Sequence, residues 1–176
     1  MTDTYADATT LIALGTIGEL EVLASLEGPI VVLPTVRDEV TTEPARATVD
    51  RFLERDGVKS TPEPELRYDD RARKILGESE SNGDVRLIAA VLSYVTADEP
   101  VGVVSDDRRV RTVARGLGAT VTGTIGAIVT AVEAGLPADE AKGMVRRVDE
   151  HGLHMTAELR AKADELVDAA ATDAVE

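Results

Sequence analysis

Apolar residues along this chain fall into two patterns that alternate from the first residues to about position 134. Short runs dominated by Val, Ile and Leu are typical of buried strands. They predict strands at residues 4–7, 30–33, 101–105 and 119–123, with a short edge strand at Val58. Longer segments place apolar residues three or four positions apart, which is the spacing of a helix face. They predict helices over 8–26, from Pro34 onward, and over 44–56, 84–97, 107–117 and 125–134.

Strands that alternate with helices of this length indicate βαβ units, and therefore a parallel sheet. We expect an α/β fold, a three-layer α/β/α sandwich with a central parallel sheet. After Leu136-Pro137, two more amphipathic helices are predicted at 138–150 and 156–170. We therefore divide the chain into a domain over residues 1–136 and a C-terminal helical extension over 137–176, packed on or beside it.

The segment from 65 to 82 is charged and weakly periodic, and it is expected to form a helix followed by a loop. Asn82-Gly83 is a turn signal, after which Asp84 is expected to be the N-cap of the next helix.

Acidic residues stand where the predicted strands end or the helices begin. They are Asp7, the pair Asp38/Glu39, Asp84, and the pair Asp106/Asp107. In an open parallel sheet the carboxyl ends of the strands lie along one edge, where ligands bind. If the fold brings these groups together, they form a carboxylate pocket for a divalent metal. Each one also has a purely structural explanation, since Asp is a favoured N-cap and acids are stabilised in a first helical turn.

The composition limits which metal such a pocket could hold. The chain has no Cys and only two His, which excludes disulfides, thiolate zinc sites and cysteine nucleophiles. Any metal would be bound by oxygen, which favours Mg²⁺ or Mn²⁺.

The net charge of −14 allows two interpretations. With 15 Arg, 4 Lys and few aromatic residues, the composition resembles that of halophilic archaea that accumulate salt, in which the acidity is a solvated surface suited to molar salt. Alternatively, the charge excludes a nucleic-acid partner, an argument that would have force at low salt. The polar, acidic start lacks the features of a signal peptide, and no apolar run approaches the roughly 20 residues that span a bilayer, so we expect a soluble, cytoplasmic protein with no membrane contact.

Three stretches together resemble the PIN-domain ribonucleases, and more closely the VapC-like branch of prokaryotic PIN proteins. They are DATTLIALGTIGELEVL near the start, PTVRDEV after the second strand, and VGVVSDDRRVRTVARGLGATVTGTIGAIVTAVEAGL, which includes Gly-Thr-x-Gly. The tail segment HGLHMTAELRAKADEL is also similar to the terminal helix of that branch. The likeness covers nearly the whole chain and is weakest over residues 44–82.

This resemblance implies an endoribonuclease whose acidic residues bind Mg²⁺ or Mn²⁺. Matched by motif, the metal ligands would be Asp7, Glu39, Asp84 and Asp107, with Asp106 sharing or replacing the role of its neighbour. Thr9 and Ser105 match hydroxyl positions that orient a carboxylate or contact a phosphate. The substrate would be RNA. Basic residues that could guide it are Arg108, Arg109, Arg111 and Arg115 on the helix after the last acids, and Arg71, Arg73 and Lys74 in the variable segment. If the analogy with toxins of this branch extends to partners, a small antitoxin and a homodimer are expected.

One departure from the family pattern bears on activity. The mid-chain helix commonly opens Gly-Glu-x-Glu in this branch, but here it opens Gly83-Asp84-Val85-Arg86. Arg86 could weaken a second metal site or supply a phosphate contact. The alternative function is therefore a catalytically weakened PIN-fold module that acts by binding. A phosphoacceptor domain is disfavoured because no Lys lies between Lys74 and Lys142, and a nucleotide binder because neither GTIG sequence has the spacing of a phosphate loop.

Overall fold

Five parallel strands form the centre of the computed structural model, which describes residues 1–174. The order across the sheet is β3-β2-β1-β4-β5, and every neighbouring pair is parallel. The strands are β1 (Asp3–Ala6), β2 (Ile30–Val31), β3 (Val58–Lys59), β4 (Val101–Val104) and β5 (Thr120–Thr122). The predicted three-layer sandwich is confirmed, and each predicted strand is present. The strands predicted at 30–33, 101–105 and 119–123 are one or two residues shorter than expected, the first strand begins and ends one residue earlier, and the edge strand at Val58 includes Lys59.

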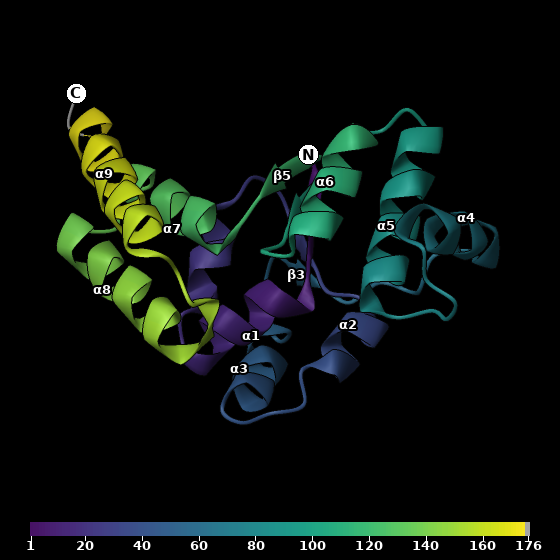
Figure 1. Ribbon diagram of the computed structural model, residues 1–176, viewed down its shortest axis with the longest axis horizontal. Helices are drawn as coiled ribbons and strands as arrows, with labels where there is room; N and C mark the ends of the chain where they lie inside the picture. Colours follow the sequence, from purple (N-terminus) through teal and green to yellow (C-terminus); the bar gives the residue numbers. More distant parts are fainter. Residues whose placement is uncertain (175–176) are drawn as a thin grey trace.

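Helices cover both faces of this sheet (Figure 1). On one side, α1 (Ala8–Thr16), the 3₁₀ helix η1 (Leu20–Ser25) and α7 (Thr124–Glu133) pack together, with α3 (Ala45–Phe52) outside α1. On the other side, α5 (Gly83–Thr96) packs against α2, α4 and α6. The ranges of those three are Pro34–Glu39, Leu66–Leu76 and Arg108–Gly116.

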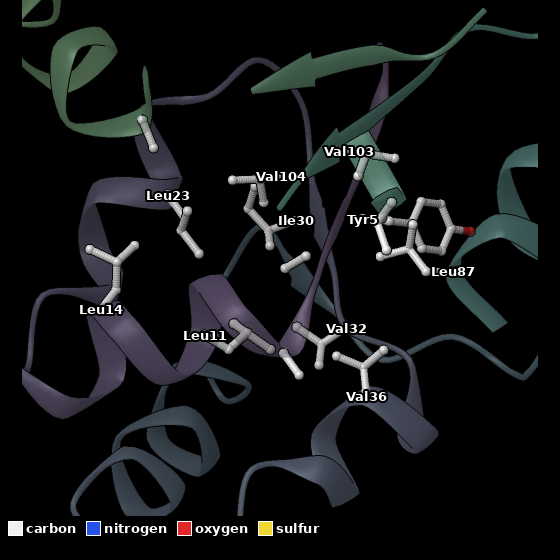
Figure 2. Packing of buried hydrophobic residues seen from close by; sticks show 14 of the residues in the cluster. Tyr5, Leu11, Leu14, Leu23, Ile30, Val32, Val36, Leu87, Val103 and Val104 are labelled. Carbon is white, nitrogen blue, oxygen red and sulfur yellow. The ribbon is translucent and has the colours of Figure 1, made fainter. Parts of the chain in front are cut away.

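Side chains alternate between the two faces of the central strands. Figure 2 shows Tyr5 and Val103 pointing to the side of Leu87 on α5, whereas Val104 and Ile30 point to the side of α1 and η1. All five are at most 5% exposed. Strands buried on both faces require continuous apolar runs, which is why the sequence signal for them is clear.

The single helix predicted over 8–26 is wrong. The α-helix ends at Thr16, and after Gly18 the chain continues as a 3₁₀ helix. Gly18 has φ = 76°, in the left-handed region, and the N–H of Glu19 bonds back to the carbonyl of Leu14 at 2.9 Å. A glycine in this conformation ends a helix, although the apolar spacing continues past it.

Two further predictions need correction. The helix predicted over 44–56 is shorter, at Ala45–Phe52. Asp84 is not the N-cap of α5, because Asn82 holds that position and its side-chain oxygen accepts the N–H of Val85 at 2.9 Å. Asp84 lies in the first turn instead, which leaves its carboxylate available for other contacts.

The C-terminal helices share the core of the sandwich. α8 (Ala138–Val148) and α9 (Ala157–Asp173) pack on each other and on α7, and their buried residues belong to the same apolar cluster as the sheet. Between them, η2 (Asp149–Leu153) approaches α1. Figure 1 shows α7, α8 and α9 grouped at one end of the molecule. Within residues 1–174, no helix is long and apolar enough to cross a membrane.

Candidate active site

Acidic side chains from four segments meet at the carboxyl edge of the sheet. Asp7 directly follows β1 and precedes α1, while Asp106 and Asp107 follow β4 and precede α6. Glu39 ends α2, and Asp84 lies in the first turn of α5. Because β1 and β4 are parallel neighbours in register, their ends place Asp7 beside Ser105 and the two aspartates after it.

Asp7 is at the centre of this group and is 1% exposed. Its Oδ2 accepts hydrogen bonds from the hydroxyls of Ser105 and Thr9, the latter at 2.9 Å. Burial raises the pKa of the Asp7 carboxyl; the two hydroxyls lower it, and the negative charge of Asp84 raises it further. The predicted orienting hydroxyls thus lie against the carboxylate that they were expected to orient.

The side chain of Glu39 extends from the end of α2 to the N-terminus of α5, where its Oε1 accepts the N–H of Gly83 at 2.6 Å. A Cβ on Gly83 would lie 2.5 Å from Glu39 Oε2, so a larger residue here would displace the carboxylate from the helix N-terminus. Partial burial raises the pKa of Glu39, the Gly83 N–H lowers it, and the charges of Asp84 and Asp7 raise it. Asp38, its neighbour, is 74% exposed at the side chain and pairs with Arg37.

Asp84 is held by a cation of the protein itself. Its Oδ2 lies 3.1 Å from Nη2 of Arg109, whose Nη1 pairs with Glu78 at 2.7 Å. Burial raises the pKa of Asp84, Arg109 opposes this shift, and the charge of Asp107 adds to it. Arg109 therefore joins α6 to the N-terminus of α5 and the end of α4 through contacts that sequence reasoning missed. Arg109 is one of four arginines on α6, and nothing in the sequence indicated that it, and not its neighbour Arg108, would pair with Asp84.

The two aspartates after β4 have different contacts. Asp106 accepts the N–H of Thr124 at 2.9 Å, the Thr124 hydroxyl, and the Thr10 hydroxyl at 3.3 Å, which ties β4 to α7 and α1. Asp107 caps α6, with its Oδ1 accepting the N–H of Val110 at 2.8 Å. Its Oδ2 takes no hydrogen bond among the described residues, which favours Asp107 over Asp106 as a ligand.

Arg86 does not join this group. Its Nε lies 3.3 Å from Asp69 and 3.9 Å from Glu63 on the far side of α5, and only 18% of its side chain is exposed. Asp69 is buried and also accepts the hydroxyl of Ser81 at 2.8 Å. The basic residue at this position therefore pins the connector before α4, and the loop after it, to α5.

The arginines of α6 differ in what they contact. Arg109 pairs with acids, and Arg111 donates to the carbonyl of Ser105 at 2.8 Å. Arg108 and Arg115 are exposed and make no ion pair within the described part of the chain. Arg108 is next to Asp107, and Arg115 is two turns away.

Buried or partly buried carboxylates that raise one another's pKa are what a hard cation neutralises, and every donor here is oxygen, so the donor set suits Mg²⁺ or Mn²⁺. Over residues 1–174, however, no three acidic or histidine side chains lie close enough together to hold one ion as they stand. The ion pair between Arg109 and Oδ2 of Asp84 would compete with an ion for this carboxylate.

Comparison with known proteins gives one match. A model of the PIN-domain family matches residues 4–169, which includes every acid of the site and most of the C-terminal helices. No curated protein matches the chain.

Proposed function

The chain belongs to the PIN-domain family, whose members are generally nucleases and typically use divalent metal ions, and we propose that it is a metal-dependent endoribonuclease. The observation that supports this most strongly is the grouping of Asp7, Glu39, Asp84 and Asp107 along one sheet edge, near enough to one another that, in addition to burial, their charges raise the pKa values of the first three. We further propose that it belongs to the VapC-like branch, with RNA as substrate.

In this proposal Asp7, Asp84 and Asp107 hold Mg²⁺ or Mn²⁺, and Glu39 binds through water or at a second ion. When bound, such an ion supplies Lewis-acid activation of a water for attack on a phosphodiester and stabilises the leaving oxygen. Ser105 and Thr9 keep the Asp7 carboxylate in one orientation by donating to the same oxygen. Arg86 is occupied by acids, so we assign phosphate binding to Arg108, whose guanidinium can bind two phosphate oxygens at once.

The same proposal accounts for the charge of the chain. At −14 it repels RNA at low salt, whereas molar salt shortens the Debye length to about 3 Å, so that only groups at the cleavage site act on the strand. We therefore propose a halophilic cytoplasmic enzyme. As the toxin of a toxin-antitoxin pair, it would have a small antitoxin that covers the carboxylates, and it would act as a homodimer.

The second candidate is a PIN-fold module that has lost catalysis and binds RNA or protein. It is favoured by the hold of Arg109 on Asp84 and by the lack of three converged ligands among the described residues. Calorimetry with Mn²⁺ separates the two candidates. An enzyme binds Mn²⁺ and loses that binding on Asp7→Asn, whereas a module shows no carboxylate-dependent binding.

The direct test is cleavage of RNA in molar KCl with Mn²⁺. We expect endonucleolytic products from the wild type and at least a 100-fold slower reaction for Asp7→Asn. Asp38→Asn is the matched control, because it makes the same chemical change at an exposed acid, and it should cleave at the wild-type rate. Retained cleavage by Asp7→Asn in a folded protein would sink the assignment.

A further inference from the structure

A cleft of about 830 Å³ opens beside the carboxylate edge. Thr9, Asp106 and Asp107 line it on the side of the candidate active site, and Ile12 and Ile125 form part of its apolar wall. Thr9 donates to Asp7, so one side chain belongs to both the cleft and the acidic group. A group bound in the cleft would therefore lie next to the substrate bond that is cleaved at the carboxylates.

The opposite wall of the cleft comes from the C-terminal part of the chain. His151 and Leu153 line it from η2, and Leu159 and Leu166 line it from α9. These two leucines are 48% and 40% exposed, so the wall is apolar but open.

Asp149 fixes the shape of this wall. It accepts the N–H of Met155 at 2.6 Å and pairs with Arg160, which closes the turn between α8 and α9. Within that turn Gly152 has φ = 152° and His154 has φ = 47°. These contacts hold His151 in the lining of the cleft.

Charges of both signs line the cleft, since Arg108 and Arg111 lie there together with Asp106 and Asp107. Arg108 is exposed and has no ion-pair partner among residues 1–174, although the chain has 33 acidic residues and only 19 basic ones. Arg111, which also lines the cleft, is already bonded to the carbonyl of Ser105. An unpaired guanidinium above apolar walls suits a ligand with a phosphate at one end and a flat, weakly polar body.

We propose that this cleft binds the base and ribose of one unpaired nucleotide, with Arg108 on its phosphate, next to the phosphodiester bond at the carboxylates. The volume lies within the roughly 300–1,000 Å³ of small-ligand sites. Aliphatic side chains pack against the faces of the base, and His151 and Thr122 reach its polar edge. A duplex keeps its bases stacked inside, so only a single-stranded or flipped-out nucleotide can enter. The inference rests on the proposed function, because it takes RNA as the substrate.

The test measures binding without metal and without cleavage, so its outcome is separate from that of the nuclease assay. The full chain is labelled at isoleucine methyls and titrated by NMR with adenosine 5′-monophosphate, adenosine or inorganic phosphate, in EDTA and constant KCl. The nucleotide should shift the methyl signals of Ile12 and Ile125 and leave those of the core residues Ile30 and Ile88 unchanged. Adenosine should shift the same two signals at higher concentration, and phosphate alone should not.

Two matched pairs of variants locate the contacts. Arg108→Gln should weaken nucleotide binding at least fivefold. Arg115→Gln changes an arginine of the same helix that is also exposed and has no ion-pair partner among residues 1–174, and it should not change binding. His151→Asn should weaken it at least threefold, whereas His154→Asn, outside the cleft, should not.

The proposal is overturned if the nucleotide leaves the Ile12 and Ile125 signals in place, or if both arginine variants weaken binding equally. It is also overturned if those signals move with protein concentration alone, because the cleft is then covered by a second copy of the chain.

Discussion

Binding of Mn²⁺ should raise the melting temperature of this protein, and Asp7→Asn should abolish that rise. Three carboxyl groups, on Asp7, Glu39 and Asp84, have raised pKa values because they are desolvated and repel one another. A divalent cation reduces both the cost of desolvation and the repulsion between the carboxylates. It does so only in the folded chain, because the carboxylates are far apart in the unfolded chain. Ion binding and folding are therefore linked.

The size of the effect follows from mass action. At 100 times its dissociation constant, a ligand that binds only the folded state stabilises it by about 2.7 kcal/mol. For a chain of 176 residues, 1 kcal/mol corresponds to roughly 2–4 °C, so the rise should be roughly 5–11 °C.

Without metal, Asp7→Asn has opposing effects. The hydroxyl bonds from Ser105 and Thr9 lose about 1 kcal/mol each when their acceptor loses its charge. Removal of a buried, unpaired charge offsets this by several kcal/mol. We therefore expect the metal-free variant to melt at or above the wild-type temperature.

The assay is calorimetric or fluorescence-detected melting across a Mn²⁺ titration, with KCl held at molar concentration so that ionic strength stays constant. Asp38→Asn is the control and should show the full wild-type rise. The reasoning is refuted if Asp7→Asn shows the same rise as the wild type, because the stabilising ion would then bind elsewhere.

Three further predictions follow from the site. The carboxyl pKa values are raised in the folded chain, so above about pH 4 it keeps protons that the unfolded chain has lost. The stability of the metal-free protein should therefore fall as the pH rises from 4 toward neutrality, and it should fall less steeply in Asp7→Asn. The midpoints of urea unfolding across this pH range measure the effect. Gly83→Ala places a Cβ 2.5 Å from an oxygen of Glu39 and should displace that carboxylate. The variant should weaken Mn²⁺ binding and cost at most about 1 kcal/mol of stability, the value of one hydrogen bond. Gly143→Ala, with no atom closer than 3.8 Å, should cost nothing in the same urea titration. Arg109→Gln frees its carboxylate partner and should tighten Mn²⁺ binding in calorimetry by up to about fivefold, since an exposed ion pair is worth at most about 1 kcal/mol; weaker binding would show that this arginine positions the ligand instead.

The sheet was predictable because strands buried on both faces leave uninterrupted apolar runs, and because such runs alternate with helical segments. The edge that carries the site followed from the same pattern, since Asp7 and Ser105 come directly after two strands that turned out to be parallel neighbours. The prediction of the first helix was wrong because of a single glycine. Apolar spacing continues through Gly18, and its left-handed backbone is not encoded in that spacing.

The partners of charged residues were the least predictable part. Asn82 and Asp84 can both cap a helix, and the sequence alone does not decide between them. Arg86 and Arg109 both stand near Asp84 in the fold, yet one pairs with Asp69 on the far side of α5 and the other with Asp84 itself. Which acid an arginine meets depends on how α4, α5 and α6 pack, and helical spacing fixes only which residues share a face.

The central claim is that three aspartates from separate segments hold one divalent ion, and the most direct measurement is the anomalous diffraction of Mn²⁺ in crystals of the wild-type chain. We predict an anomalous peak between Asp7, Asp84 and Asp107, with Asp84 turned away from Arg109, and no such peak in crystals of Asp7→Asn. A peak elsewhere, or none at saturating Mn²⁺, would contradict the account.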